Sequence, residues 1–335
     1  MGDVLAVGMI GAGGIARSHL GAIAECDSIR VAAVMDTDSE RAHAAAAEFG
    51  GSQYGELDGI LGDPQVEAVH VCTPHNLHAD QVVAAAKAGK HVLVEKPMAL
   101  SLADCDRMIE ACDLAEKVLM VGQVMRYYPV NLKVKELIGD GAIGEVGHMM
   151  RRRHSYFSPL GPGQPSWYLD QQTGGNCVLY CFGPHEYDIL PWYLDSAVTR
   201  VYAQGSESTE LYRGQQDSYT ALMTHASGAV SVLSQSVVCR PGAHDQFIIG
   251  SDGSMMLTNS KLVLNGEEVP IDSSLGGMGR QLREFARCCL EGGEPDASGH
   301  SVRHTMAVIE AVQLSAERAE PIEVDGAGSG CQLAT

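Results

Sequence analysis

Short apolar runs alternate with amphipathic segments along the first part of the chain. The apolar runs, rich in Val, Ile and Met, predict β-strands, and the segments between them have the period of a helix. The predicted strands cover residues 4–10, 29–35, 68–72, 91–95 and 118–121. The predicted helices cover residues 15–25, 39–49, 77–88 and 102–116. This alternation is typical of a doubly wound parallel sheet in a nucleotide-binding domain.

The pattern changes after Gly122. Several strand-like runs there follow one another with Gly-containing turns between them, which indicates a mainly antiparallel sheet. Its predicted strands cover residues 146–153, 199–204, 218–225, 229–236, 247–250, 254–257 and 262–264. Its predicted helices cover residues 129–138, 185–193, 280–290 and 302–319. We therefore predict three parts: a first domain over residues 1–123, a second over 124–325 and a flexible tail over 326–335.

The length and charge of the chain restrict its partners. A chain of 335 residues exceeds the size at which one hydrophobic core usually stops growing, which favours two domains. The formal net charge of −19 argues against a nucleic acid or an anionic membrane surface as partner, because both need a concentrated basic footprint. Three consecutive arginines, Arg151, Arg152 and Arg153, form the one basic cluster. We interpret them as a solvated strand edge or as ion-pair partners, with an anionic substrate group or a cofactor phosphate as the alternative.

Targeting and metal signals are also weak. No apolar run approaches the roughly 20 residues needed to cross a bilayer, and the start of the chain has the pattern of a strand without a basic stretch before it. We expect no membrane association and a cytoplasmic location. The ten cysteines are scattered without the paired spacing of a zinc site, so we predict no metal site and buried thiols.

A glycine-rich turn lies between the first predicted strand and the first predicted helix. It carries Gly11, Gly13, Gly14, Ile15 and Ala16, which fit the G-x-G-x-x-G/A fingerprint of dinucleotide-binding proteins. The first glycine permits the tight turn, the second lets the backbone approach a pyrophosphate, and the alanine keeps the helix close to the sheet. The helix N-terminus then faces the anion.

The second predicted strand ends at a carboxylate. Asp36 follows about 20 residues after the fingerprint, where a carboxylate accepts hydrogen bonds from the ribose hydroxyls of adenosine and repels a 2′-phosphate. No basic residue follows Asp36 directly, and Arg41 is expected to face solvent or to pair with a carboxylate. The sequence therefore predicts NAD as the cofactor and disfavours NADP.

Several further motifs resemble one known family. They are Thr73-Pro74-His75-Asn76-Leu77-His78, the tripeptide Glu95-Lys96-Pro97, Gly122 followed by Arg126, Tyr127 and Pro129, Gly174-Gly175 followed by His185 and Asp188, and the late turn Ile249-Gly250-Ser251-Asp252-Gly253. Their order and spacing resemble the glucose-fructose oxidoreductase, inositol dehydrogenase and rhizopine-catabolism family over almost the whole chain.

The resemblance implies a fold, a reaction and an assembly. The fold is an α/β N-terminal Rossmann domain followed by an α+β domain with a large, mostly antiparallel, open-faced sheet. The reaction is hydride transfer between NAD and a secondary hydroxyl or ketone of a sugar, polyol or related compound. The assembly is a homodimer or homotetramer formed through the sheet.

The resemblance also assigns roles to individual residues. Lys96 is expected to hydrogen-bond the reacting oxygen, and His185 is expected to act as the acid/base, since an imidazole exchanges protons near neutral pH. The motifs add expected cofactor contacts to those of the glycine-rich turn and Asp36: Thr73, Pro74, Asn76, His78, Glu95, Lys96 and Arg126. Trp167 is expected against the nicotinamide edge or at the domain junction, with ordinary core packing as the alternative.

The chain departs from the family pattern at one position. Many members have an Asp four residues before the catalytic His, and this chain has Cys181 there. At α-helical spacing, that side chain shares the face of His185. A Cys cannot fix an imidazole tautomer as a carboxylate does, so Tyr180, or else Tyr156 or Tyr168, is the candidate phenolic donor in its place.

Two other functions remain open from the sequence. One is an enzyme with tightly bound NAD that uses transient oxidation for elimination, glycoside cleavage or epimerisation. The other is a non-catalytic sensor of NAD or a sugar, which the retained Lys96 and His185 disfavour.

Overall fold

The computed structural model describes residues 4–161, 163–258, 261–324 and 326. They divide into two compact units. The first combines the described residues up to Tyr127 with Leu275–Arg303, and the second combines Tyr128–Ser274 with the described residues from His304 onward. The predicted tail lies, apart from Gly326, outside the described residues.

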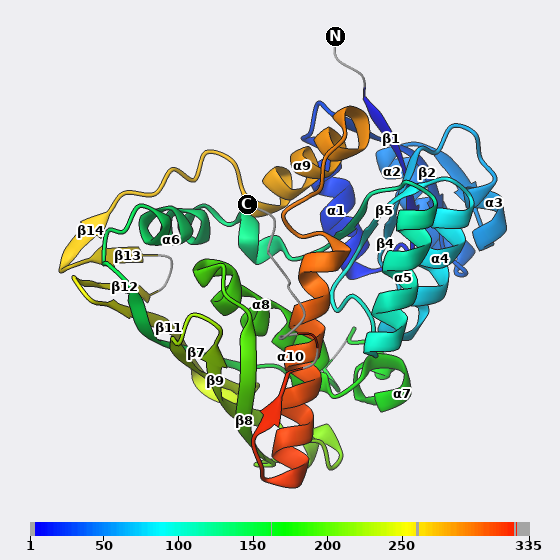
Figure 1. Ribbon diagram of the computed structural model, residues 1–335. Coiled ribbons are helices and arrows are strands. Elements are labelled where there is room, and N and C mark those ends of the chain that lie inside the picture. The colour runs from blue at the N-terminus through cyan, green and yellow to red at the C-terminus, as the bar shows by residue number, and fades with distance from the viewer. Residues whose placement is uncertain (1–3, 162, 259–260, 325, 327–335) are drawn as a thin grey trace. The chain divides into compact units, whose positions relative to one another are not determined.

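The first unit is built on a six-stranded parallel sheet in the order β3-β2-β1-β4-β5-β6 (Figure 1). Its strands are β1 (Leu5–Ile10), β2 (Ile29–Met35), β3 (Ser52–Tyr54), β4 (Ala68–Val71), β5 (His91–Val94) and β6 (Leu119–Val121). All six residues of β1 are buried, because helices cover both faces of such a sheet, and this explains its continuous apolar run. The strand order reverses between β1 and β4, where ligands bind in sheets of this type.

The helices of the first unit are α1 (Gly14–Ala24), α2 (Ser39–Phe49), α3 (Leu57–Leu61), α4 (His78–Lys87), α5 (Leu102–Leu114) and α9 (Gly277–Glu291), with 3₁₀ turns η1 (His75–Leu77) and η2 (Val124–Tyr127). Helix α1 packs beside α2 and α9, and α4 packs beside α5 (Figure 1). The pattern did not predict β3, because this three-residue edge strand has no buried side chain, and it did not predict α3, which is only five residues long.

One segment differs from the predicted domain division. The sequence placed everything after residue 123 in the second domain, whereas Leu275–Arg303, with α9, lies in the first unit. The physical reason is packing: α9 contacts α1, β1 and β2, and the buried ring of Phe285 meets the ring of His70 on β4 edge-on at 5.4 Å between centroids. The first unit is therefore completed by a segment distant in sequence.

The second unit contains a nine-stranded sheet in the order β14-β13-β12-β11-β7-β10-β9-β8-β15. Neighbouring strands are antiparallel, except that β7 and β10 are parallel. The strands are β7 (Val146–Tyr156), β8 (Val198–Ser206), β9 (Ser218–His225), β10 (Val230–Ser236), β11 (Val238–Gly250), β12 (Ser254–Thr258), β13 (Lys261–Leu264), β14 (Glu267–Val269) and β15 (Ile322–Glu323). Strand β11 begins nine residues before the predicted run (247 against 238), because its first half is polar and carries a register shift.

The second unit also contains helices. They are α6 (Pro129–Gly139), α7 (Gln171–Gly174), α8 (Gly183–Leu194) and α10 (Gly299–Arg318, in this unit from His304), with 3₁₀ turns η3 (Ser166–Leu169) and η5 (Glu210–Tyr212) and the π-helix η4 (Cys177–Phe182). Of these, α8 and α6 contact strands of this sheet. Helix α8 contacts β7 and β10, and α6 packs on α8 (Figure 1). Nearly all of α8 is buried, which makes it the central helix of the unit.

A row of apolar side chains crosses one face of the sheet. Cross-strand partners place Tyr202, Leu222, Val232, Met150, Phe247, Met256 and Val263 in one line. Leu222 and Met150 remain 46% and 48% exposed in the single chain. We call this row the apolar stripe.

No described helix is both long and apolar enough to span a membrane.

Candidate active site

The glycine-rich turn leaves space beside the backbone at the start of α1. Gly11 has φ +89°, and a Cβ there would lie 2.7 Å from the Cys72 carbonyl oxygen, so only glycine fits. A Cβ on Gly13 or Gly14 would meet no atom from any other described part of the chain within 4 Å. Packing within the chain therefore does not explain these two glycines, whereas a close-lying pyrophosphate does. Ala16 is fully buried, as a helix held close to the sheet requires.

Asp36 is fixed against this turn. One carboxylate oxygen accepts a hydrogen bond from the Ala12 amide at 2.7 Å, and the other accepts from the Asp38 amide at 2.8 Å. Asp38 caps α2 and pairs with the exposed Arg41 at 3.0 Å, in agreement with both roles expected for that arginine. The turn and the carboxylate together fit an adenosine diphosphate moiety whose ribose is read by Asp36.

The turn after β4 contains both exposed and buried side chains. Thr73 donates its hydroxyl hydrogen to Gln81 at 2.6 Å, and Asn76 is exposed. His78, the first residue of α4, is fully buried. Its Nδ1 lies 2.9 Å from the Pro97 carbonyl oxygen, and its Nε2 lies 3.0 Å from the Thr73 carbonyl oxygen. His78 therefore connects the turn after β4 to the turn after β5.

The turn after β5 carries Lys96, which is half-buried. Glu95, the residue before it, is buried and accepts a hydrogen bond from Nε2 of His19 on α1 at 2.8 Å. The other Glu95 oxygen accepts from the Lys96 amide at 3.1 Å. The carboxylate of Glu95 is thus held inside the first unit, and sequence reasoning missed its partner His19.

Arg126 has partners within the first unit. Its guanidinium donates to the Asp296 carbonyl oxygen at 2.5 Å and to the Ser301 hydroxyl at 3.0 Å. The side chain is 4% exposed. These contacts tie η2 to the segment after α9, so a contact of Arg126 with the cofactor stays a prediction.

In the second unit, His185 lies in the first turn of α8 and is half-buried. The next residue, Glu186, is almost fully buried and pairs with two arginines of β7: Arg151 Nε lies 2.5 Å from Oε2, and Arg153 Nε lies 3.3 Å from Oε1. Three residues after His185, Asp188 accepts a hydrogen bond from the Thr305 hydroxyl at 2.7 Å. The sequence left both ion pairing and anion binding open for the arginine cluster, and the structure shows ion pairs.

The segment before α8 differs from the continuous α-helical turn expected there. Residues Cys177–Phe182 form a π-helix, and α8 begins at Gly183. The α-helical spacing that placed Cys181 on the face of His185 therefore does not apply across this junction. Tyr180 is 7% exposed and packs on Gly175, where a Cβ would lie 2.6 Å from the ring.

Two aromatic residues lie on the loop before the π-helix. Trp167 is half-buried and covers Gly174, and its ring is tilted against that of Tyr168 with 4.4 Å between centroids. Burial and the neighbouring Cys181 raise the pKa of Tyr168, which keeps its phenol protonated. Tyr156 lies elsewhere, half-exposed at the end of β7 beneath the guanidinium of Arg240. Trp167 thus has packing partners within the second unit.

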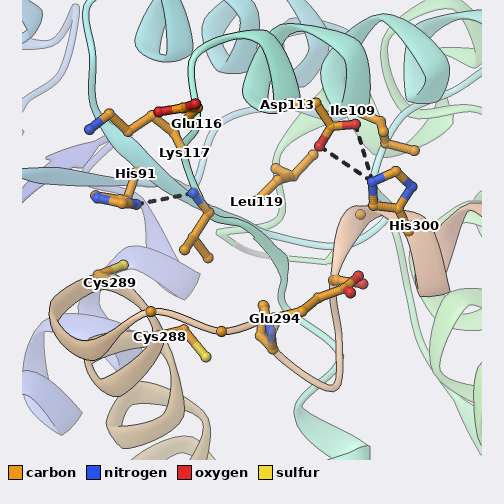
Figure 2. Close-up of a pocket in the computed structure, with 16 residues that line it drawn as sticks. His91, Ile109, Asp113, Glu116, Lys117, Leu119, Cys288, Cys289, Glu294 and His300 are labelled. Carbon is orange, nitrogen blue, oxygen red and sulfur yellow. Dashed lines mark hydrogen bonds and ion pairs between the residues drawn. The ribbon is translucent and has the colours of Figure 1, made fainter. Parts of the chain in front are cut away.

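A cavity of about 410 Å³ lies at the amino ends of β5 and β6 in the six-stranded sheet (Figure 2). It is lined by His91, the first residue of β5, by Lys117 before β6, and by Asp113 and His300, which pair at 3.2 Å. The glycine-rich turn, Asp36 and Lys96 follow the opposite ends of the parallel strands. This cavity is therefore separate from the predicted cofactor site.

No cluster of three or more His, Cys, Asp or Glu side chains able to hold a metal occurs among the described residues.

The parallel sheet in 3-2-1-4-5-6 order, the open glycine turn and the anchored Asp36 define a dinucleotide-dependent enzyme with a second, sheet-based domain. A model of the oxidoreductase family with an NAD-binding Rossmann fold matches residues 5–123, and a model of the GFO/IDH/MocA C-terminal domain matches residues 131–256. The chain belongs to the GFO/IDH/MocA oxidoreductase family, as its motifs predicted, and is an NAD-dependent oxidoreductase.

Individual relatives agree with this assignment. The chain is 31% identical to D-apiose dehydrogenase from Paraburkholderia graminis, over 94% of this chain and 88% of that protein. It is 27% identical to myo-inositol 2-dehydrogenase from Thermotoga maritima, over 95% and 98%. Its structure is similar to that of aldose-aldose oxidoreductase from Caulobacter crescentus complexed with glycerol, with a TM-score of 0.86, 26% identity, and coverage of 96% and 100%.

Proposed function

We propose that this enzyme transfers a hydride between NAD and a secondary hydroxyl or ketone of a neutral sugar, polyol or related compound. The observation that carries the proposal is the half-buried Lys96 at the carboxyl end of β5, on the same sheet edge as the open glycine turn and Asp36. Ligands bind at this edge of such sheets. The names of relatives that act on apiose and inositol support a polyhydroxylated substrate.

The reaction needs a hydride acceptor, a group that takes the hydroxyl proton, and positive charge near the developing alkoxide. NAD supplies hydride chemistry when it is bound. In this proposal the Lys96 ammonium stabilises the reacting oxygen, and His185 accepts or returns the proton, with Tyr180 as an additional phenolic donor. The backbone of Gly11, Gly13, Gly14, Ile15 and Ala16, together with Asp36, Thr73, Pro74 and Asn76, binds the cofactor.

The other residues predicted to contact the cofactor have a supporting role in this proposal. The side chains of His78, Glu95 and Arg126 have partners inside the first unit, so they support the cofactor site through the turns that they hold. Trp167, half-buried beside Tyr168, is placed against the nicotinamide edge in this proposal.

The test is to measure NADH formation with a panel of sugars and polyols, using the wild type, Lys96→Ala and His185→Ala. We expect turnover with at least one substrate and a loss of about 100-fold or more in each variant, in the range of lost acid/base and electrostatic catalysis. NAD affinity should persist in both. Full turnover in either variant would remove that residue from the mechanism, and substrate consumption without net NADH would contradict the dehydrogenase assignment.

We also propose that the enzyme forms a homodimer or homotetramer through the apolar stripe. An apolar row across an open sheet is unfavourable in water, and two copies related by a two-fold axis can cover it with the same surface. A cytoplasmic location is supported by the cysteines, because every one that the structure describes is a free thiol, which is typical of a reducing compartment.

A further inference from the structure

Lys96 is the one residue of its tripeptide with a half-exposed side chain, and the residues on both sides of it are buried. A lysine side chain has four rotatable bonds, so its ammonium is placed only as well as its backbone is held. Two buried histidines from different helices contact the residues on either side of it: His19 meets the Glu95 carboxylate, and His78 meets the Pro97 carbonyl oxygen.

The first contact comes before Lys96. His19 lies on α1, five residues after Gly14 at the start of that helix, and is fully buried. Its Nε2 donates to Oε1 of Glu95 at 2.8 Å, while Oε2 of Glu95 accepts from the Lys96 amide at 3.1 Å. The Glu95 carboxylate therefore links α1 to the backbone amide of Lys96 through two hydrogen bonds.

Gly122 leaves the space that this carboxylate occupies. A Cβ on Gly122 would lie 2.8 Å from Oε1 of Glu95 and 3.3 Å from its Cα, closer than side chains tolerate. Gly122 has no positive φ that would by itself require glycine. The glycine after β6 is thus needed for room around Glu95.

The second contact comes after Lys96. Nδ1 of His78 lies 2.9 Å from the Pro97 carbonyl oxygen, with the ring fully buried. Proline has no amide hydrogen, so its carbonyl is the backbone group by which this residue can be held. His78 begins α4, so a second helix fixes the other end of the tripeptide.

We propose that His19 and His78 are positioning residues, which hold the backbone on either side of Lys96 through Glu95 and Pro97. The inference rests on the proposed function, in which Lys96 contacts the reacting oxygen. Buried hydrogen bonds of this kind hold catalytic groups within the narrow geometric tolerance that catalysis needs.

Amide isosteres test each contact separately. The amide of Gln reaches the position of an imidazole Nε2, and the amide of Asn reaches the position of Nδ1. His19→Gln should therefore keep the bond to Glu95, which His19→Asn loses. The pattern is reversed at the other site, where His78→Asn should keep the bond to Pro97 and His78→Gln should lose it.

We expect the crossed pattern in kcat. His19→Asn and His78→Gln should lower kcat about 10- to 100-fold, and His19→Gln and His78→Asn should stay within about threefold of wild type. The Kd for NAD should remain unchanged in both His19 variants, because the open glycine turn and Asp36 are not altered. His43→Asn, on the exposed face of α2, is the matched control and should retain full kcat.

Gly122→Ala provides a second variant that leaves both histidines in place. Its added methyl group should displace Glu95 and lower kcat with little change in the Kd for NAD. Folding of each variant is checked by its thermal midpoint. If the histidine variants do not fold, the kcat of Gly122→Ala decides the matter, and wild-type turnover in it would overturn the proposal.

Lys96→Ala separates this inference from the proposed function. Full turnover in Lys96→Ala would overturn the role of the lysine itself. Loss of turnover in Lys96→Ala, together with equal kcat for the Asn and Gln variants at each histidine, would overturn the positioning role alone.

Discussion

Arg151 on β7 and Glu186 on α8 form an ion pair with 2.5 Å between Nε and Oε2, and their side chains are 10% and 3% exposed. Gln246 on β11 accepts a further hydrogen bond from the same guanidinium at 2.7 Å. The pair joins the central helix to the middle of the sheet, one residue from His185. Glu186 also pairs with Arg153, whereas Glu186 is the only carboxylate paired with Arg151 among the described residues, so removing Glu186 leaves the buried charge of Arg151 uncompensated.

The first prediction concerns the stability of this pair. Glu186→Leu should lower the free energy of unfolding by about 3 kcal/mol or more, because it leaves the buried Arg151 without its carboxylate. The double variant Arg151→Met, Glu186→Leu should lose about 2 kcal/mol less than the sum of the single losses, because it removes both charges. Urea denaturation of the four proteins of the cycle measures this, and additive losses would contradict it.

Arg152 is the matched control. It lies between the two paired arginines but pairs with Asp245 on the more exposed face, and its own side chain is 46% exposed. Arg152→Met should cost only about 0.2–1 kcal/mol, as exposed pairs do.

The second prediction concerns cofactor choice. Asp36→Ser combined with Thr37→Arg removes the carboxylate that repels a 2′-phosphate and adds a cation that pairs with it. The ratio of kcat/KM for NADP to that for NAD should rise by about 100-fold, equivalent to about 2.7 kcal/mol. Asp38→Ser, which alters the cap of α2 instead, should leave the ratio unchanged. An unchanged ratio in the double variant would remove Asp36 from cofactor selection.

The third prediction concerns pH and His70. Burial, and next the neighbouring His19, hold the pKa of His70 well below its usual range, with Glu95 acting in the other direction. The ring lies between His19 of α1 and Phe285 of α9, and neither nitrogen has a hydrogen-bond partner among the described residues. Unfolding therefore favours protonation of this imidazole.

The sign follows from proton binding. Below the unfolded pKa near 6.5 the unfolded state binds more protons, so stability is full above that pH and falls as the pH drops below it. One such group contributes a slope of up to about 1.4 kcal/mol per pH unit. His70→Leu should reduce the slope between pH 6.5 and 5 and should not lower stability at pH 8, since it removes an unpaired polar group. Thermal midpoints at pH 5 and 8 measure both effects, and an unchanged slope would show that His70 does not contribute to it.

The fourth prediction concerns assembly through the apolar stripe. Leu222→Glu places a charge in the middle of the stripe, and burying two such charges against each other is unfavourable. Size-exclusion chromatography with light scattering should show an oligomer for the wild type and a smaller species for Leu222→Glu. Leu114→Glu, at an 81% exposed position of α5, should assemble like the wild type. A wild-type monomer, or an unchanged oligomer in Leu222→Glu, would exclude this interface.

The sequence alone predicted much of the first unit, because buried parallel strands and amphipathic helices leave strong periodic signals. The ranges of β2 and α2 were predicted to the residue, as was that of β9 in the second unit. The glycine-rich turn and Asp36 were also readable, since local chain geometry imposes those residue types at fixed spacing.

Tertiary structure decided what depends on contacts between distant residues. The sequence could not show that α9 completes the first unit, that a π-helix precedes α8, or that Glu186 pairs with Arg151 and Arg153. In the sequence, His19 is one residue of a predicted helix, and His78 is the last residue of a motif. Only the fold places His19 against Glu95 and His78 against Pro97. Periodicity records which side of an element is buried, whereas the partner of a buried polar group depends on which other element the chain folds against it.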